Sequence, residues 1–294
     1  MLKVVCIPAY NEGEHIYQIV KNSLNYVDIV IVCDDGSTDD TLIKAQKAGA
    51  KIIQNKKNLG KGASLKKLFE EVRNLNADVI VTIDGDGQFL PTEIPKLMSS
   101  VIENESDIVI GYRFDDLVEM PTYRKIGNKM LDKLVELAAE LPFRDTQSGF
   151  RAYSKKAISK IQFQSDGFGA DSEILVNASQ NDLKISEEKV TVIYNTGGST
   201  STKNPVSHSS EVAFSIIELI ALKRPLSLLG IPGIILMIVG IIFGITVVSM
   251  FNDTRYFSIP STLISLGAFL GGLLLILMAV VLFSISRSVV GKHS

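Results

Sequence analysis

The sequence predicts an α/β domain, in which helices cover both faces of a mostly parallel sheet, followed by a transmembrane hairpin of two helices. The domain is predicted because short β-branched runs alternate with segments of helical spacing, and three of those runs end in polar loops. The hairpin is predicted by uncharged apolar stretches at residues 226–252 and 256–286. Each exceeds the roughly 20 residues that cross a bilayer as a helix.

The expected elements of the domain alternate along the chain. Strands are expected at residues 2–7, 28–33, 51–54, 78–83, 107–110 and 184–194. Helices are expected at residues 14–26, 39–48, 92–103, 124–140, 154–161 and 171–180, with another of roughly fifteen residues opening at 58–62. This βα alternation is typical of a parallel sheet with helices on both faces.

The strand at residues 78–83 is expected at the centre of the sheet, and it leads directly into Asp84 and Asp86, with Gln88 just after them. Open α/β sheets bind ligands at the carboxyl ends of their strands. Two carboxylates and an amide suit Mg²⁺ or Mn²⁺ held against a diphosphate. A surface turn is the alternative. An EF-hand loop is excluded, because Pro95 stands where that loop needs a bidentate glutamate.

Two further strands end in polar loops at the same predicted edge. Tyr10 and Glu12 follow the first strand, and Asp34 and Asp35 follow the second. A nucleotide that lies across this edge, with a metal on its diphosphate, would explain all three loops together. A dinucleotide-binding dehydrogenase is disfavoured, because no G-x-G-x-x-G follows the first strand.

Lys61 stands between two glycines at the start of an expected helix, where it could meet a phosphate. The segment is not a Walker A loop, because Asn55 and Ala63 occupy positions where that loop requires glycine and serine or threonine. A solvated surface lysine is an equally good interpretation.

The composition excludes some other classes of site. The formal net charge of the 294 residues is −2, so nothing indicates a nucleic-acid-binding protein. Cys6 and Cys33 each end an apolar run and are interpreted as buried small hydrophobic residues, without a zinc or disulfide pattern.

The chain is expected to divide into parts of different character. Residues 1–205 have the composition of one globular domain. Residues 206–225 fit an amphipathic helix along the membrane surface, with a packed globular helix as the alternative. Spans are expected at about 226–250 and 262–286, and residues 287–294 form a short tail.

Basic residues predict the orientation of the hairpin. Lys223 and Arg224 precede the first span, and Arg287 and Lys292 follow the second. The break at residues 252–255 carries one basic and one acidic residue. By the positive-inside rule, both termini and the globular domain face the cytoplasm of a cell membrane that the chain crosses twice.

Five motifs occur in a fixed order along the domain. They are Pro8-Ala9-Tyr10-Asn11-Glu12, Asp34-Asp35-Gly36-Ser37-Thr38-Asp39, Asn58-Leu59-Gly60-Lys61-Gly62, Asp84-Gly85-Asp86 and Asp145-Thr146-Gln147-Ser148-Gly149-Phe150-Arg151. Together they resemble the family-two glycosyltransferases of the GT-A fold. Within that family the chain looks like the dolichyl- or polyprenyl-phosphate hexose synthases, which include dolichol-phosphate mannose synthase. The resemblance covers residues 2 to about 200.

The resemblance implies a role for particular residues. Those implied to bind the nucleotide sugar are Pro8, Tyr10, Glu12, Asp35, Asp84 and Gly85, with Lys61 as the candidate phosphate contact. Asp86 and Gln88 would hold the metal, with Asp84 beside them and close to the donor sugar. The acceptor phosphate would be bound by Arg113 and Arg124, with Lys203 and Arg151 as further candidates. Asp145 and Arg151 fall in the segment that shapes the acceptor side of the sugar pocket. For Asp145, a loop cap or a salt bridge to Arg144 or Arg151 is the alternative.

The implied reaction is an inverting, metal-dependent transfer of a hexose to dolichyl or polyprenyl phosphate, which makes a lipid-linked sugar donor for glycosylation. The hexose would come from a nucleotide sugar of the GDP-mannose or UDP-glucose type. A polyprenyl phosphate is already an anionic nucleophile, so no strong base is required. A neighbouring subunit could complete the acceptor groove, as in a homo-oligomer.

Two other functions remain open from the sequence. A glycosyltransferase acting on a polysaccharide or glycolipid would need a base for a hydroxyl group, and Asp145 or Asp171 would be the candidates. A non-catalytic membrane scaffold that binds a nucleotide sugar is the other alternative.

Overall fold

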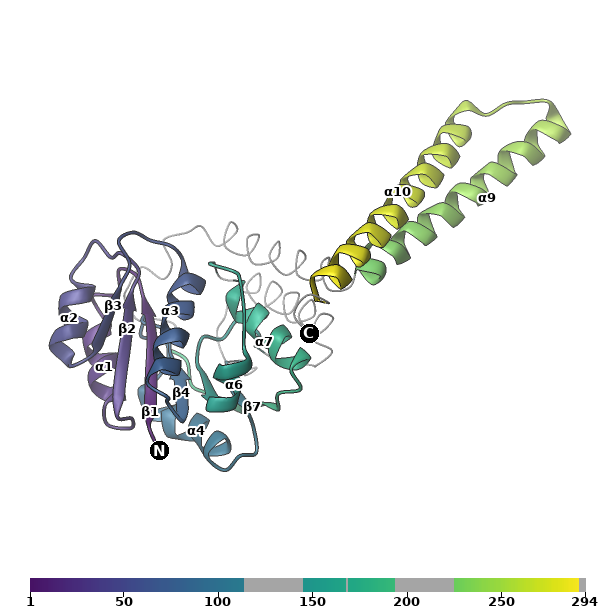
Figure 1. Ribbon diagram of the computed structural model, residues 1–294. Coiled ribbons are helices and arrows are strands. Elements are labelled where there is room, and N and C mark those ends of the chain that lie inside the picture. Colours follow the sequence, from purple (N-terminus) through teal and green to yellow (C-terminus); the bar gives the residue numbers. More distant parts are fainter. Residues whose placement is uncertain (114–144, 168, 194–224, 291–294) are drawn as a thin grey trace. The chain divides into compact units, whose positions relative to one another are not determined.

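The computed structural model describes the chain except for residues 114–144, 168, 194–224 and 291–294 (Figure 1). The chain divides into two compact units, Met1–Ile216 and Ile217–Ser294. Residue 194, the last of the expected strand at 184–194, and the expected helices at 124–140 and 206–225 lie outside the described part.

The first unit is built on a seven-stranded sheet, counted over the described residues, with the order β3-β2-β1-β4-β6-β5-β7. The strands are β1 (Lys3–Ala9), β2 (Ile29–Asp34), β3 (Lys51–Gln54), β4 (Val79–Thr82), β5 (Ile108–Tyr112), β6 (Arg151–Ser154) and β7 (Ile185–Lys189). Four of the six pairings are parallel, and β4 lies at the centre, as predicted. The sequence did not predict β6, which runs antiparallel between β4 and β5.

Helices cover both faces of the sheet. They are α1 (Ile16–Ser23), α2 (Thr41–Ala48), α3 (Lys61–Asn74), α4 (Ile94–Ile102) after the 3₁₀ turn η1 (Pro91–Glu93), α6 (Lys155–Lys160) and α7 (Ala170–Gln180). Successive side chains of a strand point to opposite faces. Val5 and Ile7 accordingly pack in one core with α1, α2 and α4, whereas Val4 and Cys6 pack in a second core with α3, α6 and α7. Cys33 is buried in the second core, so both cysteines are core residues as predicted.

The strand order brings three loops to one edge of the sheet. β2 and β4 flank β1 on either side, and all three run parallel. Ala9 at the end of β1 is paired with Asp34 at the end of β2, and the Asp35 amide donates to the Ala9 carbonyl over 2.8 Å. The loops that follow Ala9, Asp34 and Thr82 therefore emerge together, as the sequence predicted.

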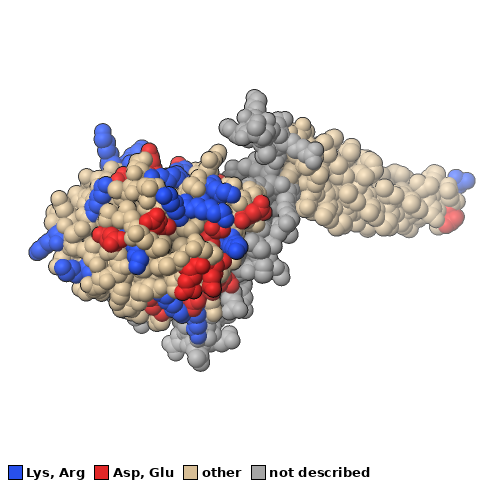
Figure 2. Space-filling view, turned by 60° about the horizontal axis from the view of Figure 1, so that its bottom comes forward, with Lys and Arg blue, Asp and Glu red and all other residues tan. Residues whose placement is uncertain are grey.

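The second unit contains two long apolar helices. A π-helical turn η2 (Leu226–Gly230) leads into α9 (Ile231–Thr254), and α10 (Ile259–Val290) returns. Large apolar side chains along both helices are exposed, as at Ile245 and Leu263, which are 65% and 64% exposed. On the visible face of the hairpin, charged side chains occur only at the tip (Figure 2).

Among the described residues, two stretches are long and apolar enough to cross a membrane, Leu226–Thr254 and Ile259–Ser284. The loop between the spans was predicted at residues 252–255, and its start was placed three residues too early. Residues 252–254 continue α9, and the helix ends at Arg255, whose left-handed backbone has a φ of 58°. Apolarity alone placed that end too early, because the polar residues at the tip stay helical.

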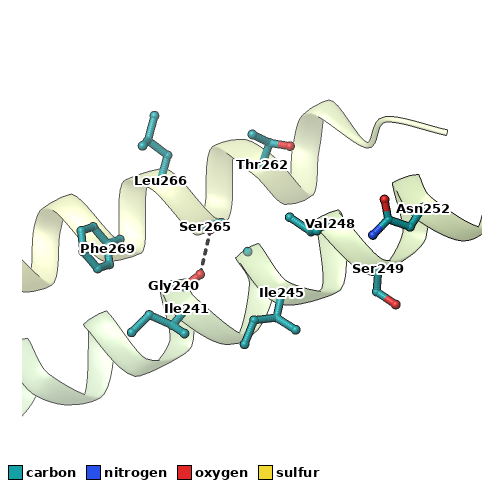
Figure 3. A pocket seen from close by; sticks show the side chains of 11 residues that line it. Gly240, Ile241, Ile245, Val248, Ser249, Asn252, Thr262, Ser265, Leu266 and Phe269 are labelled. Carbon is teal, nitrogen blue, oxygen red and sulfur yellow. Dashed lines mark hydrogen bonds between the residues drawn. The ribbon is translucent and has the colours of Figure 1, made fainter. Parts of the chain in front are cut away.

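Small residues allow the two helices of the hairpin to pack closely. A Cβ on Gly240 would lie 2.6 Å from the backbone nitrogen of Phe269, so only glycine fits there. The Ser265 hydroxyl donates to the Gly240 carbonyl over 2.7 Å (Figure 3). Small residues and interhelical hydrogen bonds are the usual means of holding helices together in a bilayer. Toward the tip the helices leave a groove of about 660 Å³ that runs from Gly240 to Asn252.

Candidate active site

The loop after β4 packs against the loop after β1 by means of two glycines. A Cβ on Gly85 would lie 3.2 Å from Cγ of Glu12 and 3.5 Å from Cβ of Ala9. Gly87 has a φ of 76°, and a Cβ there would lie 2.9 Å from Cγ of His15. A side chain at either position would push these loops apart. Gly85 and Gly87 therefore allow the loop to lie against Glu12 and His15.

The predicted metal ligands lie on a loop whose backbone is held at both sides. The Gln88 amide donates to Oδ1 of Asp86 over 3.0 Å. The Gln88 carbonyl accepts from the Ile193 amide over 2.9 Å, next to a bridge between Phe89 and Val192. These contacts fix the backbone from Asp86 to Gln88, whose side-chain amide is the predicted metal ligand.

Crowded carboxylates change the acidity of the site. Burial, followed by the charges of Asp86, Asp84 and Asp39, raises the pKa of Glu12 to about 8. Burial and the charge of Asp84 raise the pKa of Asp86 to about 6, against the opposing effects of the Gln88 amide, Lys61 and Arg113. Burial and the repulsion between neighbouring carboxylates therefore both act against ionisation of Glu12 and Asp86.

This donor set fits a divalent cation bound together with a diphosphate. Within the described residues, no group of three His, Cys, Asp or Glu side chains is placed to hold a metal by itself. Mg²⁺ commonly binds one or two carboxylates and completes its shell with substrate phosphates and water. The carboxylates of Asp84 and Asp86 and the side-chain amide oxygen of Gln88 can supply such a partial shell. A cation there would relieve the repulsion that, together with burial, raises the pKa values of Glu12 and Asp86.

Lys61 is not a solvated surface lysine. Its Nζ lies 2.8 Å from Oδ1 of Asp84 and 2.9 Å from Oδ2 of Asp171, and its side chain is 13% exposed. Burial acts to lower the pKa of Lys61, but Asp171 and Asp84 outweigh it and raise the pKa above its ordinary value. The structure thus brings Lys61 to the predicted metal loop through Asp84.

The two glycines around Lys61 have a structural cause. A Cβ on Gly60, whose φ is 100°, or on Gly62 would overlap the backbone of residues 165–166. The Ala63 amide also donates to the Asp166 carbonyl over 3.2 Å. The G-K-G motif therefore docks the start of α3 against the segment that precedes α7, which the sequence alone did not indicate.

Arg113 and Asp145 form a bidentate pair. Nε of Arg113 lies 2.6 Å from Oδ2 of Asp145, and the second terminal nitrogen lies 2.9 Å from Oδ1. The Arg113 amide also donates to Oδ2 over 3.2 Å, and the Asp145 side chain is only 1% exposed. The guanidinium carbon lies 5.9 Å from the centre of the Phe89 ring. Arg144, one alternative partner for Asp145, lies outside the described residues, and the other, Arg151, donates to main-chain carbonyls instead.

Arg151 is placed inside the protein, away from any acceptor. It is fully buried, and its terminal nitrogens donate to the carbonyls of Asp171 and Thr146, each over 2.8 Å. The predicted contact between Arg151 and the acceptor phosphate is therefore wrong for this conformation. The reason is that Arg151 begins β6, whose pairing with β4 places its side chain in the core between the sheet and α7.

Asp35 is buried and holds the following loop together. Its two oxygens accept from Nδ2 of Asn55 over 2.6 Å and from the amides of Leu59 and Gly60 over 3.0 and 2.8 Å. Asp35 therefore shapes the loop that ends at Lys61, and its contact with a nucleotide base stays a prediction.

The remaining predicted residues are placed as follows. Pro8 is paired with Cys33 inside the sheet, and both Pro8 and Tyr10 are partly exposed near the carboxyl end of β1. Arg124 and Lys203 lie outside the described residues, so their contacts with the acceptor phosphate stay predictions.

Gly149 is a site residue that sequence reasoning did not single out. A Cβ on Gly149 would overlap the Asp84 carboxylate, so glycine is required where the segment that follows Asp145 crosses the metal loop. The Thr82 hydroxyl donates to the Gly149 carbonyl over 2.8 Å and holds the crossing in place. The signal for Gly149 was its place in the last of the ordered motifs.

The raised pKa of Glu12 predicts a dependence of stability on pH. The folded state keeps a proton on Glu12 up to a pH of about 8, whereas the unfolded chain loses it near 4.5. The unfolded chain therefore binds fewer protons in this window, and the stability of the metal-free protein falls as the pH rises through it. In chelator, thermal unfolding of the wild-type protein should show this fall, and Glu12→Gln should flatten it. An unchanged slope in the variant would contradict the assignment.

Comparisons with known proteins give the following relatives. A sequence model described as glycosyl transferase family 2 matches residues 4–162. Glycosyltransferase AglJ of Haloferax volcanii is 29% identical over 237 residues, which are 78% of this chain and 76% of that protein. A UDP-N-acetylglucosamine–dolichyl-phosphate N-acetylglucosaminyltransferase of Methanococcus voltae is 34% identical over 215 residues, 64% of this chain and 84% of that protein. Glucosyl-3-phosphoglycerate synthase of Mycobacterium tuberculosis, solved with Mn²⁺, UDP and phosphoglyceric acid, has a TM-score of 0.58 at 20% identity, over 74% of this chain and 78% of that one.

Proposed function

Because the chain belongs to glycosyl transferase family 2, we propose that this glycosyltransferase moves a hexose from a nucleotide sugar to dolichyl or polyprenyl phosphate. The predicted GT-A fold is confirmed by the likeness to the solved glycosyltransferase. The lipid acceptor is supported by a relative whose name specifies dolichyl phosphate, and by two exposed apolar helices that fit a membrane protein.

The proposal depends most on the surroundings of Asp145 and Asp171, the two carboxylates that could act as a base. A hydroxyl acceptor would need a carboxylate that can take its proton. Asp145 is 1% exposed and bound at both oxygens by Arg113, and Asp171 is buried against Lys61. Neither carboxylate is available as a base. A phosphate acceptor needs none, because it is already ionised at neutral pH.

The reaction brings together two anions that repel one another, the leaving diphosphate and the acceptor phosphate, and charged residues of the site can stabilise both. Asp84, Asp86 and Gln88 would hold a divalent cation, Mg²⁺ or Mn²⁺, which neutralises the leaving diphosphate. Lys61 adds a positive charge beside Asp84. Arg113 is 15% exposed and is held by Asp145 through two nitrogens, so it would contribute its positive charge to the acceptor phosphate from a fixed position. Attack of the acceptor oxygen opposite the leaving group inverts the anomeric carbon.

The membrane arrangement follows from the charges at the ends of the hairpin. Basic residues flank both spans on the side of the globular domain, so the site faces the cytoplasm and both termini lie there. The product would be a lipid-linked sugar for later glycosylation. A second subunit could complete the groove that receives the acceptor.

The test is transfer by the purified full-length chain. The protein would be incubated with polyprenyl phosphate and, separately, labelled GDP-mannose, UDP-glucose and UDP-N-acetylglucosamine, each with Mn²⁺, Mg²⁺ or chelator. We expect one donor to place label in an acid-labile lipid, and chelator to abolish it. Hydrolysis of a donor without labelled lipid would contradict the acceptor, and binding without turnover would favour the scaffold.

A further inference from the structure

One lysine is shared almost equally between two carboxylates from different elements. Nζ of Lys61 lies 2.8 Å from Asp84 and 2.9 Å from Asp171. Lys61 opens α3, Asp84 follows β4, and Asp171 lies in the first turn of α7. The side chains of Lys61 and Asp171 are 13% and 6% exposed, so water competes little for these contacts. The ammonium therefore contacts Asp84 and Asp171 at nearly equal distances.

The two carboxylates differ in what else surrounds them. Asp84 lies among anions, because Asp86 and Glu12 are close enough for its charge to raise their pKa values. At Asp171 the buried guanidinium of Arg151 donates to the main-chain carbonyl, and among the described residues the ion pair of the Asp171 carboxylate is with Lys61. A divalent cation at Asp84 and Asp86 would repel the Lys61 ammonium away from Asp84. Asp171 is the carboxylate placed to receive it.

We propose that Asp171 is a positioning residue that takes the Lys61 ammonium when a divalent cation and a diphosphate bind, and so frees Asp84 for the donor. No chemistry is assigned to Asp171 itself. An ammonium has three donors and Lys61 contacts two carboxylates, so a diphosphate oxygen could accept from it as well. The inference rests on the donor half of the proposed function and is independent of the acceptor.

The docking of α3 supports this role. Gly60 and Gly62 seat the start of the helix on residues 165–166, and Lys66 donates to the Gln164 carbonyl and to the Asp166 carboxylate over 2.5 and 2.6 Å. The backbone at Lys61 is thus fixed next to α7. Only the flexible end of the lysine side chain has to move between Asp84 and Asp171.

The test is a double-mutant cycle read by binding rather than by activity. Isothermal titration calorimetry would measure the affinity of the full-length chain for Mn²⁺ in the presence of UDP and, separately, GDP. Asp171→Asn should weaken Mn²⁺ binding about tenfold, a coupling typical of residues in contact. In a Lys61→Met background the same substitution should have no further effect, because no ammonium remains to be held. Asp171→Glu should restore much of the affinity.

Control variants separate this role from others. Ser172→Ala removes the neighbouring hydrogen bond from Gln147 to α7 and should leave Mn²⁺ affinity unchanged. Equal weakening by Asp171→Asn in both backgrounds would show a structural effect and overturn the proposal. Lost turnover with unchanged Mn²⁺ affinity would mark Asp171 as a base and also overturn the proposal.

Further outcomes separate this inference from the proposed function. If the wild-type chain fails to bind Mn²⁺ both in the presence of UDP and in the presence of GDP, the donor site and this inference both fail. If binding follows the cycle but no lipid is labelled, only the acceptor assignment fails.

Discussion

Replacing Asp86 by asparagine should lower sugar transfer by roughly 10²–10³-fold, the loss typical when one charge-stabilising group is removed from an active site. The main-chain amide of Gln88 donates to the Asp86 carboxylate, and burial followed by the negative charge of Asp84 raises the pKa of Asp86. An amide at this position keeps the shape of the side chain but removes the charge that holds a cation. Initial rates of lipid labelling across a Mn²⁺ series would measure the loss.

Asp40→Asn provides a matched control for that experiment. Asp40 lies on the same domain and pairs with Lys44, and its side chain is 53% exposed. Exposed ion pairs contribute little to stability, so this variant should transfer sugar like the wild type. Equal transfer by Asp86→Asn and the wild type would contradict the placement of the cation at this loop.

Replacing Asp145 by alanine should lower the free energy of unfolding by about 3–5 kcal/mol, because it removes the carboxylate that binds the largely buried guanidinium of Arg113 through two nitrogens. Arg113 makes two side-chain contacts with Asp145, at 2.6 and 2.9 Å, and is itself 15% exposed. Denaturant unfolding of the purified chain would measure the change.

The double variant Arg113→Met/Asp145→Met distinguishes the pair from a simple loss of packing. The double variant removes the buried guanidinium together with its carboxylate, so it should be more stable than Asp145→Ala. Lys51→Ala, which breaks an ion pair in which Lys51 is 48% exposed, should cost no more than about 1 kcal/mol. A double variant less stable than Asp145→Ala would contradict the assignment of the cost to a buried charge that has lost Asp145.

Local patterns were sufficient to predict most of the fold. Strand β3 has the predicted limits, and β4 is central and followed by the carboxylate loop. These features depend on the periodicity of apolar residues and on turn residues, which are read over a few positions. Strand β6 was missed because its first residue is a buried arginine, and a charged residue does not enter an apolar pattern.

The contacts within the site could not be predicted in the same way. Lys61 meets Asp84 and Asp171 across long separations in sequence, and Arg113 meets Asp145 across 32 positions. Which cation pairs with which carboxylate depends on the strand order, in which the antiparallel β6 lies between β4 and β5. The residue types at the site were therefore predictable, whereas their partners required the tertiary structure.

The most direct test of the central claim compares two lipids that differ only in the phosphate. The full-length chain would be given its donor and Mn²⁺ with polyprenyl phosphate or with the corresponding polyprenol. Asp145 and Asp171, the two carboxylates considered as bases for an alcohol, are both held by cations. Labelled lipid should form from the phosphate alone. Comparable labelling of the polyprenol would contradict the account, because it would require a carboxylate that can take the proton of an alcohol.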